Sequence, residues 1–142
     1  MSDNSEGVSS DDFIRLKVPA SAGEMEKIQS FIDSVLKGLC SVKVQRQIHV
    51  AADEIFTNIC SYSGSKYAEM GIRVEAERIC LEFRDCGVPF NPLTGTEPDV
   101  TLSAEEREIG GLGIFIVKKT MQNLHYEYRN GQNILTMTKI IS

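Results

Sequence analysis

The chain of 142 residues carries 15 lysines and arginines against 20 aspartates and glutamates, a formal net charge of −5. This balance argues against a nucleic-acid-binding protein, which needs a basic stripe to displace counterions from phosphates. No stretch approaches the ~20 apolar residues of a membrane span, and the ordinary globular composition predicts one soluble domain.

Residues 1–12 are rich in serine and acidic residues and lack the basic and apolar regions of a signal peptide, so they predict a disordered N-terminal arm. A single domain is expected at residues 13–142, in the cytoplasm. The four cysteines form no C-x-x-C pair and only two histidines are present, which argues against a zinc site. We expect reduced thiols, with Cys40, Cys60 and Cys80 as small buried residues.

The first elements predicted in chain order are a strand at residues 13–18, ended by Pro19, and a helix at 25–36. Ser21 and Glu24 have the spacing of a capping box before this helix, and Gly38 follows its end. A second amphipathic helix is predicted at residues 42–62. Two helices therefore come directly after the first strand.

Strands are predicted next at residues 70–75 and 79–84, joined as a hairpin. A long segment at 85–110 holds three of the four prolines and precedes a helix predicted at 112–124. Strands at 125–129 and 134–141 follow, joined by an Asn130-Gly131 turn. Because most strands come as hairpins, we predict an α+β fold: a two-layer sandwich with three helices on one face of a mainly antiparallel or mixed sheet.

The helix at 42–62 carries Glu54, Asn58 and Tyr62 at intervals of four residues, so the three side chains lie along one stripe beside the apolar face. Carboxylate and carboxamide oxygens are ligands that Mg²⁺ prefers. A polar stripe in water explains the same spacing.

Asp85 ends a predicted strand, and Gly87 follows two residues later. An acceptor-only carboxylate at this point could accept a hydrogen bond from an exocyclic amine such as adenine N6. The missing Cβ of Gly87 would let a flat ligand approach the backbone. A simple Asp-x-Gly turn is the alternative.

Three glycines, Gly110, Gly111 and Gly113, lead into the apolar helix predicted at 112–124. Backbone N–H groups at such a helix N-terminus form an anion site. A flexible hinge before a core helix is the alternative.

Together, the segments DEIFTNICSY, DCGVPFNP and GGLGIFIVKK resemble, in this order, the N box and the two glycine boxes of the GHKL ATPase superfamily. That superfamily includes histidine kinases, type II topoisomerases and MutL. The short chain and these three sequences look like the anti-sigma-factor serine kinases. The resemblance covers nearly the whole chain, and it implies the GHKL (Bergerat) ATP-binding fold.

The resemblance implies a role for each matching residue. Glu54 would be the general base and Asn58 the Mg²⁺ ligand. Asp85 would bind adenine N6, with Gly87 beside the base. The phosphates would be held by residues of the last box: Gly111, Leu112 and Gly113.

The same resemblance implies that residues 91–109 form a lid over the triphosphate. Within it, Arg107 would pair with the γ-phosphate or a partner, although a solvated charge explains Arg107 equally well. Two features depart from the superfamily pattern. Pro89 replaces a glycine, and no Gly-Thr pair is clear before the last strand, because Thr136 and Thr138 do not align with it.

The resemblance implies an enzyme that transfers the γ-phosphoryl group of Mg-ATP to a serine of an anti-sigma-factor antagonist (a STAS-type protein) and that also binds a sigma factor. A homodimer is expected, with no direct contact to nucleic acid or membrane. The alternative is a nucleotide-binding partner switch without kinase activity. Glu54 favours the kinase, because a pure switch needs no base at that position.

Overall fold

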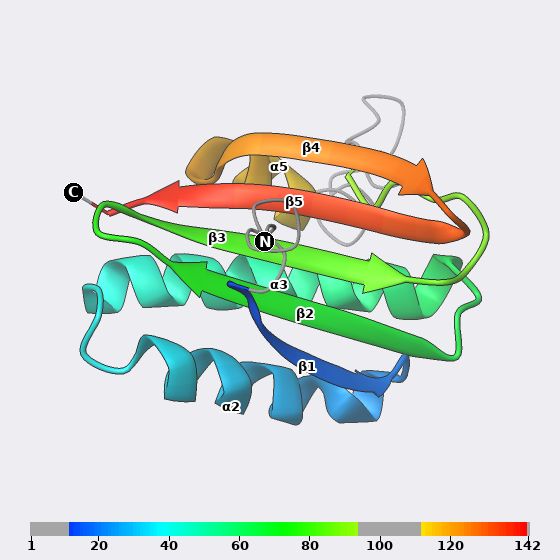
Figure 1. The fold of residues 1–142 in the computed structure, drawn as a ribbon, viewed down its shortest axis with the longest axis horizontal. Coiled ribbons are helices and arrows are strands. Elements are labelled where there is room, and N and C mark those ends of the chain that lie inside the picture. Colours follow the sequence, from blue (N-terminus) through cyan, green and yellow to red (C-terminus); the bar gives the residue numbers. More distant parts are fainter. Residues whose placement is uncertain (1–11, 94–111, 142) are drawn as a thin grey trace, which may run out of the picture.

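The computed structural model describes residues 12–93 and 112–141, which form two layers (Figure 1). In chain order the elements are β1 (Ile14–Pro19), the 3-10 helix η1 (Ala22–Glu24), α2 (Met25–Leu36), α3 (Val42–Tyr62), β2 (Tyr67–Val74), β3 (Arg78–Asp85), α5 (Leu112–Thr120), β4 (Gln122–Arg129) and β5 (Gln132–Ile140). The strands form one antiparallel sheet in the order β1-β2-β3-β5-β4, and α2, α3 and α5 cover one of its faces. The predicted α+β sandwich is confirmed.

Local signals explain the elements that the sequence predicted best. The helix predicted at 42–62 is confirmed with the same bounds, and the Ser41 hydroxyl caps it by accepting from the Val44 N–H at 3.1 Å. The Asn130-Gly131 turn joins β4 to β5 with φ angles of 55° and 78°. Both angles lie in the left-handed region that the tight hairpin turn requires.

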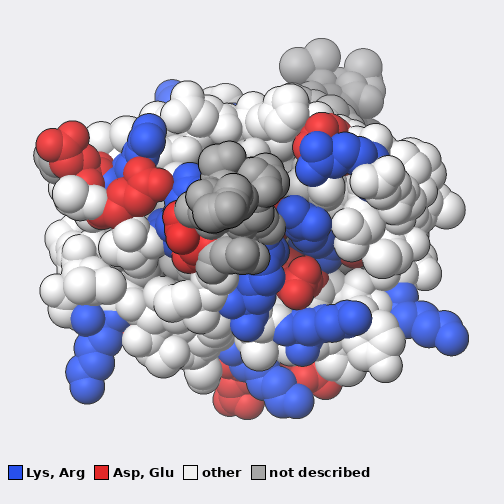
Figure 2. All heavy atoms as spheres, in the orientation of Figure 1, with Lys and Arg blue, Asp and Glu red and all other residues white. Residues whose placement is uncertain are grey.

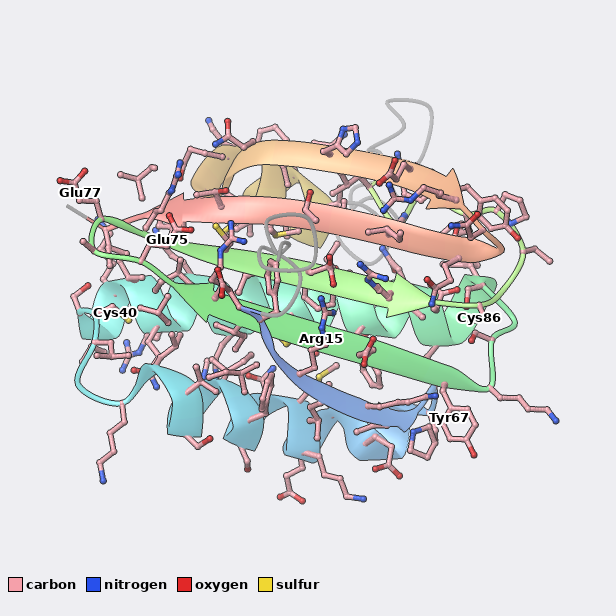
Figure 3. All side chains as sticks on the ribbon, in the orientation of Figure 1. Arg15, Cys40, Tyr67, Glu75, Glu77 and Cys86 are labelled. Carbon is pink, nitrogen blue, oxygen red and sulfur yellow. The ribbon has the colours of Figure 1, made fainter. Side chains whose placement is uncertain are left out.

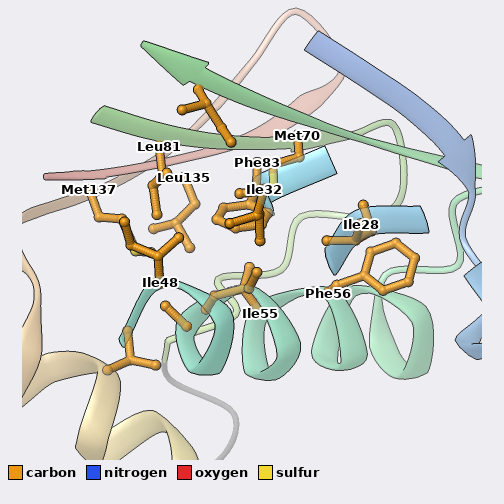
Figure 4. Close-up of a cluster of buried hydrophobic side chains, with 14 of the residues drawn as sticks. Ile28, Ile32, Ile48, Ile55, Phe56, Met70, Leu81, Phe83, Leu135 and Met137 are labelled. Atoms are coloured by element: carbon orange, nitrogen blue, oxygen red, sulfur yellow. The ribbon is translucent and has the colours of Figure 1, made fainter. Parts of the chain in front are cut away.

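The core lies between the helices and the sheet (Figure 4). Apolar side chains of α2 and α3 pack against the inward-facing side chains of the central strands. Those labelled in Figure 4 are Ile28, Ile32, Ile48, Ile55, Phe56, Met70, Leu81, Phe83, Leu135 and Met137. Burying one side chain of this size stabilises the fold by ~1.5–3 kcal/mol. The central helix α3 is therefore fixed along its whole length on the sheet.

The predicted capping box before α2 is wrong. The Ser21 hydroxyl accepts from the Gly23 N–H at 3.4 Å, because the 3-10 turn η1 separates Ser21 from α2. Glu24 is the N-cap of α2 but makes no side-chain cap bond, and its carboxylate pairs with Lys27 at 3.0 Å.

The third helix also ends earlier than predicted, at Thr120 instead of residue 124. Asn123 has a φ of 54°, and the pairing of β4 with β5 is irregular between Gln122 and His125. Pairing with β5 thus begins as soon as the helix ends, and it outweighs the helical spacing that continues to Leu124. The other strand ends differ from the predictions by three residues or fewer.

The second face of the sheet carries interleaved basic and acidic side chains (Figure 2). At its centre the buried Glu82 accepts from Arg84 at 2.8 Å and from Arg15, which is labelled in Figure 3. Burial raises the pKa of Glu82, but the bonds from Arg84 and Arg15 outweigh it, so the net pKa is lowered.

None of the four cysteines forms a disulfide. Cys40, Cys60 and Cys80 are half-buried instead of buried as predicted, and Cys86 is exposed. Among the described residues, no helix has both the length and the apolar character needed to cross a bilayer. The predicted arm at 1–12 lies, apart from Asp12, outside the described residues.

Candidate nucleotide-binding site

The site is built from four segments that meet around the C-terminal half of α3, and three of them hold the predicted site residues that the structure describes (Figure 1). These segments are the end of α3, residues 85–93 after β3, the first turn of α5 and the first residues of β5. Cys86, directly after Asp85, marks this end of β3 in Figure 3.

Asp85 is buried in the site, with only 3% of its surface exposed. Its Oδ1 accepts two hydrogen bonds, from the Gly87 N–H at 2.8 Å and from the Asn133 amide at 2.9 Å. Its Oδ2 is buried and has no hydrogen-bond partner within the described residues. A buried acceptor without a partner costs ~1–3 kcal/mol, so this atom needs a donor from elsewhere.

Glu54 lies directly against Gly113 of α5. A Cβ atom added to Gly113 would lie 1.9 Å from the Glu54 carboxyl carbon, so only glycine leaves room for this carboxylate. Burial, and secondarily the charge of Asp53, raises the pKa of Glu54. A carboxylate with a raised pKa is a stronger base than one in water.

Asn58 is buried, so it does not belong to a solvated polar stripe. Its amide nitrogen donates to the Pro92 carbonyl at 3.1 Å, which ties α3 to the segment after β3. One turn further along α3, the ring of Tyr62 packs against the ring of Phe90 with centroids 5.4 Å apart, a second contact between α3 and the segment after β3.

Gly87 packs against the end of α3. An added Cβ would lie 2.0 Å from the Ser63 carbonyl oxygen, and the neighbouring Val88 N–H donates to that same oxygen at 2.9 Å. The structure therefore gives Gly87 a packing role in the fold. Its predicted role beside a bound base stays a prediction.

The family described as the histidine kinase-like ATPase domain matches residues 18–139 of the chain. The chain belongs to this family. A curated relative, the serine/threonine-protein kinase BtrW of Bordetella bronchiseptica, is 27% identical over 107 residues, which cover 72% of this chain and 75% of the relative. A solved structure, the Acinetobacter baumannii histidine kinase AdeS, is similar over 91% of this chain and 68% of its own, with a TM-score of 0.49 and 14% identity.

Membership of this ATPase-domain family implies that the chain binds ATP. The position and surroundings of Asp85 fit this ligand, because the 6-amino group of adenine is a donor of the kind that Oδ2 lacks.

The residues present also fit Mg²⁺. No group of three or more acidic, histidine or cysteine side chains that could hold a metal occurs in the described part of the chain. Mg²⁺ bound to a nucleotide needs few protein ligands, because phosphates and water complete its shell. The Asn58 amide nitrogen is engaged by Pro92, so its oxygen Oδ1 is the atom that could bind the ion.

Asn133 is a site residue that the sequence analysis missed. Its amide donates to Asp85 and to the Val88 carbonyl at 2.9 and 2.8 Å, and its oxygen accepts from the Phe90 N–H at 2.8 Å and from the Tyr126 hydroxyl. All four hydrogen-bonding positions of the amide are thus used. Asn133 sets the orientation of Asp85 and holds the backbone at Val88 and Phe90, in the segment that follows β3. The sequence signal for Asn133 is its position two residues after the Asn130-Gly131 turn, close to where the superfamily pattern predicts a Gly-Thr pair.

The remaining predicted site residues are described in part or not at all. Gly111 and Arg107 lie outside the described residues, as does most of the predicted lid at 91–109. Leu112 is the first residue of α5, so its backbone lies at the helix N-terminus beside Gly113. The roles given to all of these residues stay predictions.

Proposed function

We propose that this protein is an ATP-dependent protein serine kinase. The observation that carries ATP binding in this proposal is the unpartnered Oδ2 of Asp85 in an otherwise satisfied network, and Glu54 against Gly113 carries the transfer step. The carboxylate is locked in one orientation by two donors on Oδ1, so Oδ2 offers one buried acceptor to the adenine 6-amino group. This arrangement selects adenine over guanine, whose C6 carbonyl would face a negative charge.

Glu54 is the base in this proposal. The serine hydroxyl of the substrate gives its proton to the Glu54 carboxylate, the serine oxygen attacks the γ-phosphorus, and the bond to the β-phosphate oxygen breaks to release ADP. The raised pKa of Glu54 suits it to accept this proton. The contact with Gly113 places the carboxylate beside the first turn of α5, where backbone N–H groups can hold the phosphates. When bound at Asn58, Mg²⁺ supplies charge neutralisation on the phosphates.

For the partners we propose an anti-sigma-factor antagonist of the STAS type as the phosphorylated protein and a sigma factor as the protein bound and silenced, in the cytoplasm. We further propose that the kinase is a homodimer. The resemblance of the three boxes to anti-sigma-factor serine kinases supports these partners, and a relative named as a serine/threonine-protein kinase supports the kinase activity alone. The alternative, a nucleotide-binding switch, needs the adenine site but no base.

The test compares two substitutions one helical turn apart on α3. Glu54→Gln keeps the shape but cannot take a proton, so it should retain Mg-ATP binding within a few-fold and lose phosphoryl transfer to the antagonist by ~10²–10⁴. Asn58→Ala should weaken Mg-dependent ATP binding itself. Glu26→Gln, an exposed carboxylate on α2, is the control and should change neither. Transfer is followed with radiolabelled ATP and the candidate antagonist.

Undiminished labelling by Glu54→Gln contradicts the role of Glu54 as base. Normal ATP binding with no labelling of any serine by the wild-type protein supports the switch in place of the kinase.

A further inference from the structure

A groove between two helices lies beside the nucleotide site, one turn before Glu54 on α3. It is lined by the N-terminal half of α3 and by α5, and its residues are Val42, Lys43, Arg46, Gln47, Val50 and Ile116. We call it the α3–α5 groove. Its volume is about 440 Å³. Both helices lie on the covered side of the sheet and pack against each other (Figure 1).

Apolar side chains are left uncovered in this groove. Val42, Val50 and Ile116 are 66%, 41% and 38% exposed, and Phe115 beside them is also exposed. Their neighbours on the same helices, Ile114 and Val117 among them, already fill the core. A single exposed apolar residue is ordinary, but several that meet on two adjacent helices form a patch of the kind that binds another molecule.

The rim of the groove is basic although the protein is acidic. Lys43 and Arg46 line it, and Lys119 lies over the Phe115 ring at 5.3 Å. Burial, and secondarily the charge of Lys43, lowers the pKa of Lys139 on β5, so one further positive charge lies close enough to Lys43 to interact with it. None of the described residues that line the groove is acidic. The groove lining thus carries two positive charges, although the net charge of the whole chain is −5.

We propose that the α3–α5 groove binds an acidic amphipathic helix of a partner protein. Apolar side chains of that helix, spaced by three and four residues, would lie against Val50 and Ile116. Its flanking glutamates or aspartates would pair with Lys43 and Arg46. The exposed apolar side chains beside two basic residues match a helix that has an apolar face and acidic flanks, and a membrane surface is the competing occupant that the test distinguishes. Val50 lies one turn before Glu54 on α3, and Ile116 lies three residues after Gly113 on α5, so a bound helix would lie next to the nucleotide site.

The test uses a fluorescein-labelled designed helical peptide with leucines on one face and glutamates on its flanks. Its affinity is measured by fluorescence anisotropy on the full chain. The wild-type protein should bind it saturably and more weakly as salt rises. Ile116→Ser and Lys43→Glu/Arg46→Glu should each lower the affinity by about tenfold or more. Leu39→Ser, an exposed apolar residue outside the groove, and Lys27→Glu on α2 are matched controls that should leave it unchanged.

ATP affinity and the thermal unfolding midpoint are measured on every variant, and both should stay at the wild-type values, which separates loss of docking from misfolding or damage to the nucleotide site. Three results would overturn the proposal. The first is no saturable peptide binding, and the second is binding that the groove variants leave unchanged. The third is binding of the wild-type protein to phosphatidylserine vesicles that the groove variants abolish, since the groove would then serve a membrane.

Discussion

Asp85→Asn is the substitution whose outcome the structure fixes most closely. In the native protein Oδ1 accepts from the Gly87 N–H and the Asn133 amide, at 2.8 and 2.9 Å. An amide nitrogen at that position would face two donors, so the new carboxamide must keep its oxygen there. Its NH₂ group then takes the place of Oδ2, and the acceptor offered to a ligand becomes a donor.

The change should reverse the choice between adenine and guanine. Loss of a hydrogen bond to a charged acceptor costs ~1.5–3 kcal/mol, which is about 10- to 150-fold in ATP affinity. The new donor can bond the guanine C6 carbonyl, for ~0.5–1.5 kcal/mol. The ratio of ATP affinity to GTP affinity should therefore fall by roughly 30- to 2,000-fold in all.

Isothermal titration calorimetry with non-hydrolysable ATP and GTP analogues measures both affinities. Asp53→Asn is the control, because it removes a carboxylate from the same region without touching the network. The reasoning fails if the wild-type protein binds the two nucleotides equally, or if Asp85→Asn keeps the wild-type preference.

Further predictions concern two glycines and two carboxylates. Gly87→Ala should lower the free energy of unfolding by ~1–3 kcal/mol, because the added Cβ meets the backbone of Ser63. Gly113→Ala should lower it less, because the flexible Glu54 side chain can move aside, but this displacement of Glu54 should reduce phosphoryl transfer. Denaturant titrations measure the stability of both variants and labelling assays measure their phosphoryl transfer. Equal losses of stability in Gly87→Ala and Gly113→Ala would contradict the prediction. The pKa of Glu54 is raised, so the transfer rate should fall as pH drops through that raised pKa, and a rate profile with no such acid limb would count against the base. The pKa of Glu82 is lowered in the folded protein, so Glu82 stabilises the fold fully above its unfolded-state pKa, and this stabilisation is lost as the pH falls through its folded-state pKa. In Glu82→Gln the free energy of unfolding should therefore fall less steeply as the pH drops. An unchanged dependence on pH would contradict this role of Glu82.

Local interactions explain what the sequence alone determined. The bounds of α3 follow from its apolar spacing, from Ser41 at its start and from the glycine-containing segment at its end. The tight turn at Asn130-Gly131 follows from the positive φ angles that these two residue types adopt readily. The three boxes and their order could also be identified from the sequence, because each box is a continuous stretch of residues.

Only the tertiary structure decided how the boxes meet. Asn133 contacts Asp85 from 48 residues away because the β3–β5 register places them as partners, and no local pattern carries that register. The Gly113 backbone lies against Glu54, and Gly87 against Ser63, through packing between elements distant in sequence. The end of α5 was misjudged for the same physical reason: pairing with β5 is a non-local interaction, and it outweighed the helical periodicity that residues 112–124 show on their own.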